Sequence, residues 1–154
     1  MSAFIATGGS TAPYPITNDG WFPPLDGQHM REALRLDGSV TDARLETAVV
    51  NAVIEVNREL KTWKAQQLAA GHASLADVPA DHIQGETELQ HLYRRAIYSS
   101  AGAELAERYR DYSATGDGAE RAEALTQTPD DYRRDARWAI RSILGRVHTT
   151  VELI

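Results

Sequence analysis

TDARLETAVVNAVIEVNRELKTWKAQQLAAG, at residues 41–71, is the most strongly patterned part of the chain. Apolar side chains recur along it at intervals of three and four residues, which places them on one face of an α-helix. Thr41 is a favourable N-cap, and Gly71 is of the type that commonly follows a helix C-terminus. One helix of this length would be about 45 Å long, more than a single small core covers. We therefore expect its far end, around Trp63 and Leu68, to project or to contact another subunit.

The helical pattern continues on both sides of this segment. Asp26 can cap a short helix that runs to about Leu36. A connector at 74–85 can hold one short turn of helix, and a second long helix is expected over about 86–112. The small residues at 99–103 would let another helix approach this one closely.

A last helix begins with a full set of capping signals. Thr128 is a suitable N-cap, Pro129 fits the first helical position, and two aspartates follow in the first turn. The helix is expected to stop at Gly145, and a loop at 114–118 with a short helical turn at 119–125 precedes it. The chain is thus predicted to be all-α, a bundle of about four helices of which two are long.

The N-terminal segment differs from this helical body in composition. Residues 1–24 combine glycines, prolines and turn-forming residues with several large apolar side chains. We expect an extended N-terminal arm with apolar anchors, because a purely disordered tail rarely carries so many such groups. Trp21 and Phe22 are expected to pack on the chain's own core, whereas Phe4 and Ile5 are candidates for contact with a neighbour.

The other end is predicted to be an extended C-terminal tail at 146–154, which leaves 25–145 as the helical domain. Residues 149–154 favour extended structure, and a lone strand would be satisfied by pairing with a neighbouring chain. A frayed terminus is the alternative. The candidate contact residues in the tail are Val151, Leu153 and Ile154.

The composition excludes several classes of protein. The 154 residues suffice for one domain that folds without metal or disulfide, and the absence of cysteine excludes thiolate sites and cysteine nucleophiles. No run approaches the roughly 20 apolar residues of a membrane span, so no membrane partner is expected. Sixteen Lys and Arg against 22 Asp and Glu give a net charge of −6, which disfavours general binding to nucleic acid.

Three arginines share one face of the last predicted helix. Arg134, Arg137 and Arg141 are spaced by three and four residues. Such a stripe could face DNA phosphates in a channel. We favour ion pairs within or between subunits, because aspartates stand beside the stripe in the sequence and the chain is acidic overall.

Motifs that carry catalytic chemistry are sparse. Glu88 and His91 form a Glu-x-x-His pair on a helix, as in di-iron bundles, but no second copy occurs. The sequence has neither a phosphate-binding glycine loop nor a Gly-x-Ser-x-Gly nucleophile elbow. We expect no enzymatic activity, cofactor or metal. Two alternatives are a metal enzyme built on Glu88 and His91, and a small helical DNA-binding or regulatory protein.

Eight short strings, ordered along nearly the whole chain, carry a family resemblance. They are Thr17-Asn-Asp-Gly-Trp-Phe-Pro23, Met30-Arg-Glu-Ala-Leu-Arg-Leu-Asp-Gly-Ser-Val-Thr-Asp-Ala-Arg-Leu45, Val56-Asn-Arg-Glu-Leu60, Ala73-Ser-Leu-Ala-Asp-Val-Pro79, His91-Leu-Tyr-Arg-Arg-Ala-Ile-Tyr98, Glu107-Arg-Tyr-Arg-Asp-Tyr112, Asp131-Tyr-Arg-Arg-Asp-Ala-Arg-Trp-Ala-Ile140 and Thr149-Thr-Val-Glu-Leu-Ile154. As a set they resemble the phage head completion/stabilisation proteins, the gene-product-L family of temperate phages with contractile tails. We expect the largest departure at 114–127.

The resemblance implies a structural head–tail connector, or neck protein. Such a protein joins the portal vertex of the filled capsid, stabilises the packaged head and prepares it for tail attachment. The implied partners are the portal protein, neighbouring copies of the chain in a ring, and tail-completion or neck proteins, with packaged DNA nearby but not bound sequence-specifically. The implied location is the neck of the virion, and the host cytoplasm during assembly. The family offers no catalytic residue to carry over.

Overall fold

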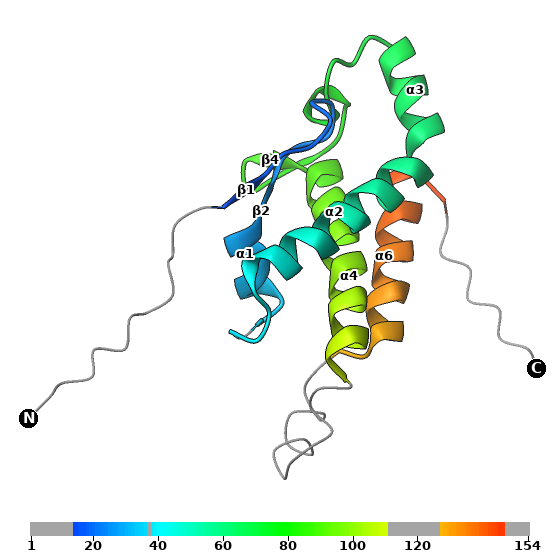
Figure 1. The fold of residues 1–154 in the computed structure, drawn as a ribbon. Helices are drawn as coiled ribbons and strands as arrows, with labels where there is room; N and C mark the ends of the chain where they lie inside the picture. Colours follow the sequence, from blue (N-terminus) through cyan, green and yellow to red (C-terminus); the bar gives the residue numbers. More distant parts are fainter. Residues whose placement is uncertain (1–13, 37, 111–126, 147–154) are drawn as a thin grey trace, which may run out of the picture.

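The computed structural model describes residues 14–36, 38–110 and 127–146, and within these ranges the chain is mainly helical (Figure 1). The helices are α1 (Gly27–Ala33), α2 (Asp42–Glu59), α3 (Lys61–Ala69), α4 (Glu88–Arg110) and α6 (Pro129–Ile143), with a 3₁₀ turn η1 (Leu75–Asp77). Two short antiparallel pairs join β1 (Pro15–Ile16) to β2 (Leu25–Asp26) and β3 (His82–Ile83) to β4 (Glu86–Thr87). The mainly helical fold is as predicted, and the two strand pairs correct the expectation of an all-α chain.

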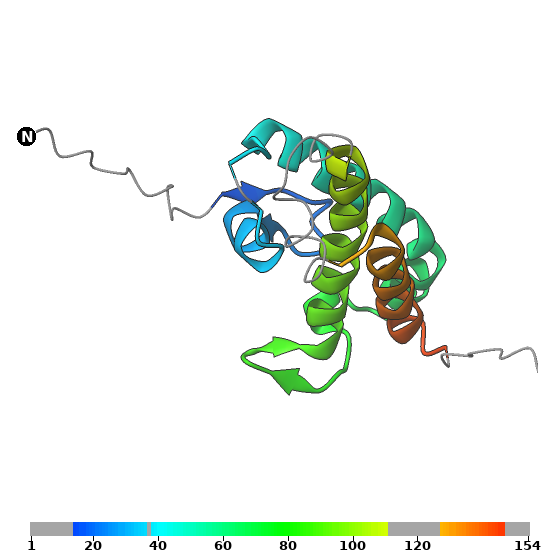
Figure 2. The same ribbon diagram turned by 90° about the horizontal axis from the view of Figure 1, so that it is seen from below.

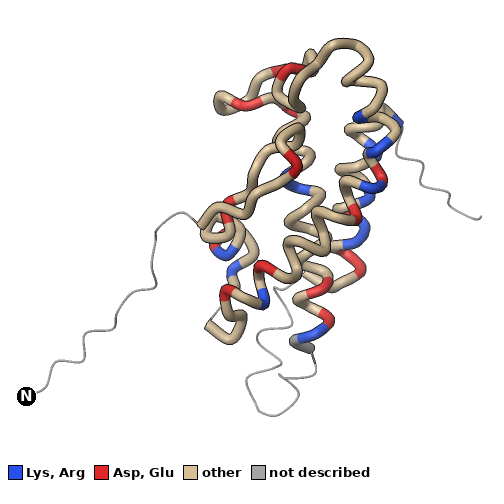
Figure 3. Tube along the Cα trace, turned by 45° about the horizontal axis from the view of Figure 1, so that its top comes forward, with Lys and Arg blue, Asp and Glu red and all other residues tan. Residues whose placement is uncertain are grey.

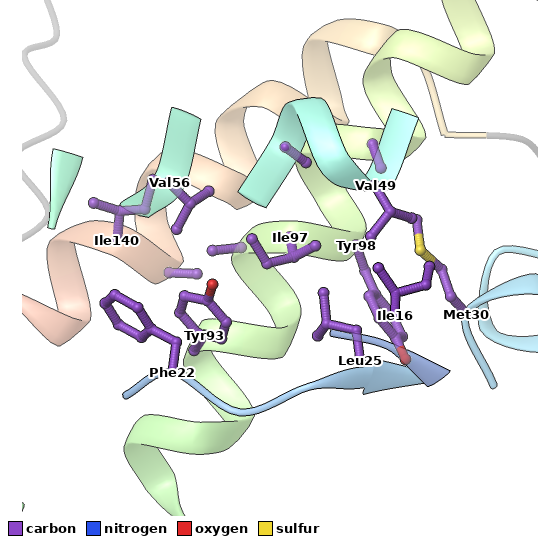
Figure 4. Packing of buried hydrophobic residues seen from close by; sticks show 14 of the residues in the cluster. Ile16, Phe22, Leu25, Met30, Val49, Val56, Tyr93, Ile97, Tyr98 and Ile140 are labelled. Carbon is purple, nitrogen blue, oxygen red and sulfur yellow. The ribbon is translucent and has the colours of Figure 1, made fainter. Parts of the chain in front are cut away.

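Helix α4 is the centre of the fold. It packs most extensively along α6 and next along α2, and the segment from β1 to β2 lies against it on another side (Figures 1 and 2). Side chains from all of these elements meet in one apolar cluster (Figure 4). Burying one large apolar side chain contributes about 1.5–3 kcal/mol, so this cluster holds the helices together. Its labelled members include Phe22, Val49, Val56, Tyr93, Ile97 and Ile140.

The close approach of α4 and α6 depends on the small residues of α4. A Cβ atom placed on Gly102 would lie 3.0 Å from a ring carbon of Tyr132, so the ring of Tyr132 occupies the space that a larger residue would fill. The prediction that 99–103 admits a neighbouring helix is therefore confirmed, and that neighbour is α6 of the same chain.

The predicted helix starts are confirmed by their caps. The Asp26 side chain accepts hydrogen bonds from the backbone N–H groups of Gln28 and His29, and Thr41 accepts one from Arg44. Thr128 and Asp131 form a reciprocal capping box at the start of α6. Helix α1 ends at Ala33, one turn before the predicted end.

The predicted single helix over 41–71 is wrong in one respect, because it is interrupted at Leu60. The φ and ψ angles of Leu60 are −86° and −1°, and α3 leaves the axis of α2 there (Figure 1). The change of direction brings Trp63 edge-on to Trp21, with ring centroids 5.9 Å apart, and brings Lys64 to Asp19. These tertiary contacts outweigh the local preference for a straight helix.

The start of the second long helix is also corrected. Helix α4 begins at Glu88 rather than near 86, because the preceding residues form the hairpin β3–β4. Gln84 and Gly85 make its turn with φ values of 53° and 79°, the pattern of a two-residue turn with both central residues left-handed. The connector before the hairpin contains the 3₁₀ turn η1, which confirms the expected short turn of helix.

The N-terminal segment is built into the core from β1 onward. Ile16, Trp21 and Phe22 are all buried, which confirms the prediction that Trp21 and Phe22 pack on the chain's own core. The expectations for the arm residues before 14, for the loop and turn at 114–125 and for the tail strand at 149–154 lie outside the described residues.

Candidate protein-binding surfaces

A polar network fixes the loop 17–24 to the body. Asn18 donates to the phenolic oxygen of Tyr93 at 2.8 Å, Tyr93 donates to the Asn57 carbonyl oxygen at 2.6 Å, and Asn57 donates back to the Asn18 oxygen at 3.0 Å. Burial raises the pKa of the Tyr93 phenol, so the hydroxyl stays neutral and acts only as a donor and acceptor. Every member is paired within the ring of three, so the network has a positioning role.

Asp19 holds the same loop to α3. One carboxylate oxygen accepts from the backbone N–H groups of Trp21 and Phe22 at 3.0 and 2.9 Å, and the other is 2.6 Å from Lys64 Nζ. Burial alone would raise the pKa of Asp19, but the hydrogen bonds from Lys64, Phe22 and Trp21 lower it overall. The indole N–H of Trp21 donates to the carbonyl oxygen of His72 at 3.1 Å. The loop thus clamps the connector that leads to the hairpin.

His91 and its surroundings hold the hairpin β3–β4 against α4. Its Nε2 atom lies 2.7 Å from the carbonyl oxygen of Ile83, and Arg94 pairs with Glu86 at 2.7 Å. The hydrogen bond from Arg94 lowers the pKa of Glu86. Among residues 14–36, 38–110 and 127–146, no three His, Cys, Asp or Glu side chains are grouped as metal ligands would be. Of the Glu-x-x-His pair, His91 therefore anchors the hairpin, and Glu88 is exposed.

The predicted arginine stripe lies on the outer side of α6, and its three arginines differ in whether they form ion pairs. Arg134 pairs with Asp131 at 2.9 Å and with Asp135 at 3.4 Å, and its guanidinium lies 5.0 Å from the centre of the Trp138 ring. Arg137 and Arg141 form no ion pair with any residue that the structure describes. Trp138 is 40% exposed beside them. An exposed tryptophan flanked by arginines is the composition typical of protein-binding hot spots.

Arg137 also borders a groove between α2, α4 and α6. The groove has a volume of about 460 Å³ and is lined by four glutamates, two arginines and mostly small side chains. Arg133, on its α6 wall, forms ion pairs with Glu107 and Asp130. The acidic lining residues are Glu55, Glu59, Glu104 and Glu107.

Apolar side chains are exposed on several other elements. Val50 and Ile54 project from α2 on the side away from the core, and Leu68 projects from α3 at 49% exposure. Ile83, at the tip of the hairpin, is 54% exposed. Trp63, which we expected to project with Leu68, is partly buried against the core. The other predicted contact residues lie outside the described ranges; they are Phe4, Ile5, Val151, Leu153 and Ile154.

The sequence prediction missed Val50, Ile54 and Ile83. Ala43, Thr47, Val50 and Ile54 recur at helical spacing opposite the buried row of α2, and this second row was a usable signal. Ile83 precedes a Gln-Gly pair, and a glycine of this kind is a turn signal that would have marked the hairpin.

Comparison with known proteins identifies the family to which the chain is similar. The profile described as phage head completion protein (GPL) matches residues 16–154, from β1 onward. The head completion/stabilization protein of Escherichia phage P2 is 40% identical over 139 residues, which cover 90% of this chain and 82% of that protein. The chain belongs to the phage head completion protein family. It therefore has a structural role in the phage head, associates with the head of the virion and interacts with other head components.

No solved structure is significantly similar to the chain. Within the described residues of this head completion protein, no helix combines the length and apolar character needed to cross a bilayer.

Proposed function

We propose that this head completion protein joins the portal vertex of the filled capsid as a non-enzymatic neck component, stabilises the packaged head and prepares it for tail attachment. The family membership, which spans 16–154, carries the proposal. A head that is complete must retain its DNA and present a surface for the tail, and a small, tightly packed helical protein is suited to a purely structural role at that point.

The distribution of exposed side chains supports a role with several partners. Large apolar side chains are exposed on α2, α3, the hairpin β3–β4 and α6, and these elements lie in different parts of the molecule (Figures 1 and 2). Scattered exposed apolar residues are common on any surface. The pairing of Trp138 with Arg134 is of the kind enriched at protein interfaces, and α6 is therefore the strongest candidate for a partner contact.

The proposed partners are the portal protein, neighbouring copies of the chain in a ring, and tail-completion or neck proteins. The chain would be made in the host cytoplasm and reside in the neck of the virion. Packaged DNA would pass nearby without sequence-specific contacts, because a net charge of −6 opposes strong binding to phosphates. The arm residues Phe4 and Ile5 and the tail residues 149–154 would pair with the portal or with a neighbour when assembly brings these partners together.

The test compares heads produced with and without the chain. Heads lacking it should lose DNA to nuclease and remain tailless, and adding the purified chain should restore nuclease resistance and tail attachment seen by negative-stain electron microscopy. Heads that retain DNA and accept tails equally well without the chain would contradict the proposal.

A truncation at residue 148 isolates the contribution of the tail. It should keep the helical circular dichroism and melting temperature of the full chain, because residues 14–146 carry the apolar cluster. It should nevertheless fail to enter heads. Normal incorporation of the truncated chain would contradict the role of 149–154 while leaving the wider function intact.

A further inference from the structure

The hairpin β3–β4 is an acidic projection with an apolar tip. From residue 65 to residue 93 the chain contains four carboxylates, at Asp77, Asp81, Glu86 and Glu88, and neither lysine nor arginine. Ile83 is the most exposed large apolar residue of the described chain, at 54%. Asp81 and Glu88, on either side of the hairpin, form no ion pair within the described ranges.

The second half of α6 and the residues after it have the opposite character. Residues 136–146 contain three arginines and no carboxylate. Arg134, Trp138 and Arg141 are spaced by four and three residues and form one ridge on the side of α6 away from its buried residues. We call this ridge the α6 basic face. Its centre is the partly exposed Trp138, and Arg141 has no acidic partner in the described part of the chain.

The two surfaces lie apart within one copy. The hairpin and α6 lie on either side of α4 (Figures 1 and 2), and the hairpin carries acidic residues but neither lysine nor arginine (Figure 3). Complementary surfaces on different sides of one chain form a heterologous, head-to-tail contact when two copies meet. The charges of the two surfaces are opposite, and each has an exposed apolar side chain at its centre.

We propose that the hairpin β3–β4 of one copy docks on the α6 basic face of the next, with Ile83 against Trp138 and with Asp81 and Glu88 near Arg141 and Arg134. This proposal rests on the proposed function, since it assigns the surfaces by which neighbouring copies associate. It needs no third component, because both halves of the contact are in the chain.

The hairpin is prepared for such a contact before assembly. His91 is hydrogen-bonded to the carbonyl oxygen of Ile83, and Arg94 forms an ion pair with Glu86. The backbone N–H of Glu88 donates to the Asp81 carbonyl oxygen at 2.8 Å. The tip is thereby fixed relative to α4. A fixed projection loses little conformational entropy on binding, which favours association.

Cysteine cross-linking in assembled heads tests the contact directly. The chain has no cysteine, so His82→Cys beside the tip and Ser142→Cys beside the α6 basic face would be the only thiols, while Ile83, Trp138 and Arg141 remain. Under mild oxidation the double variant should form a ladder of covalent multimers at least about tenfold faster than a control carrying His82→Cys and Thr47→Cys. Thr47 is exposed on α2, near the end of that helix that lies beside α1 (Figure 1). Equal rates for the two pairs would overturn the proposal.

A charge exchange tests the chemistry of the same contact. In the cross-linking background, Arg141→Glu should reduce the ladder about tenfold, and adding Asp81→Arg to the same chain should restore it, because every copy contributes both surfaces. Arg58→Glu, at an exposed position on α2, should leave the ladder unchanged. No recovery in the charge-exchanged chain would overturn the pairing.

The outcomes also separate this contact from the wider function. Heads that contain the chain and retain DNA, but show no ladder beyond the control, would refute the hairpin contact alone. Heads that retain DNA and accept tails without the chain would refute the proposed function whatever the cross-linking shows. Loss of DNA retention in Arg141→Glu with an undiminished ladder would assign the α6 basic face to DNA and overturn the contact between copies.

Discussion

The loop 17–24 and the α6 basic face both bring aromatic and polar side chains together. They differ in how far these side chains are buried and paired within the chain. In the loop, Asn18 is paired with Tyr93 and Asn57, and the Trp21 indole N–H is bonded to the His72 carbonyl. On α6, Trp138 stays 40% exposed and Arg141 has no acidic partner in the described residues. The loop stabilises one copy, whereas α6 is the surface that we propose binds another molecule.

The largest expected effect is on the aromatic stack beneath the loop. Phe22 is 2% exposed and stacks on Tyr93 with ring centroids 4.5 Å apart. Phe22→Ala should lower the free energy of unfolding by about 3–5 kcal/mol, because it leaves a cavity in the core. Chemical denaturation with circular dichroism measures this. A loss below about 1 kcal/mol would show that the loop is not part of the stabilising core.

The polar ring of three should give the next largest effect. Asn57→Ala removes the acceptor of the Tyr93 hydroxyl and the donor to Asn18, and should cost about 1–3 kcal/mol because buried polar atoms are left unpaired. Combining it with Asn18→Ala should cost clearly less than the sum of the two single changes. Strict additivity in this double-mutant cycle would show that the three side chains do not act as a unit. Thr47→Ala, at an exposed position of α2, is the control for handling and helix propensity.

Features that depend on neighbouring residues could be predicted from the sequence, whereas features that depend on long-range contacts could not. Helix starts were predictable because Asp26, Thr41 and Thr128 bond to backbone N–H groups two or three residues ahead, so the signal is local. The break at Leu60 was not, because it serves contacts of Trp63 and Lys64 with residues more than 40 positions earlier, such as the 45-residue separation between Asp19 and Lys64.

The surfaces were predictable to a similar extent. Helical spacing alone predicts that the three arginines of α6 lie on one face of the helix. Which arginine is paired depends on side-chain geometry, and only Arg134 reaches an aspartate. The hairpin was missed because strands of two residues are too short to show the alternation of apolar and polar side chains that marks a strand.

A smaller effect, dependent on pH, is expected at Asp19. Its pKa is lowered in the folded chain, so its contribution to stability is present above the ordinary aspartate pKa of about 3.8 and is lost as the pH falls through the folded value. Asp19→Asn should therefore flatten the fall in unfolding free energy below about pH 4, and it should leave the slope near pH 7 unchanged. Denaturant titrations across this range measure it. An unaltered acid limb would show that Lys64 and the two backbone N–H groups do not stabilise the carboxylate.

The smallest effect on stability is expected where the effect on assembly should be greatest. Trp138→Ala removes an exposed ring and its contact with Arg134, so it should change the free energy of unfolding by no more than about 1 kcal/mol. The same variant should reduce incorporation of the chain into heads, measured by quantitative immunoblotting of purified particles. Val50→Ala, which truncates an equally exposed apolar residue on α2, is the matched control and should be incorporated normally. If Trp138→Ala destabilised the chain as strongly as Phe22→Ala, the ring would belong to the core of one copy, and the contrast between the loop and α6 would disappear.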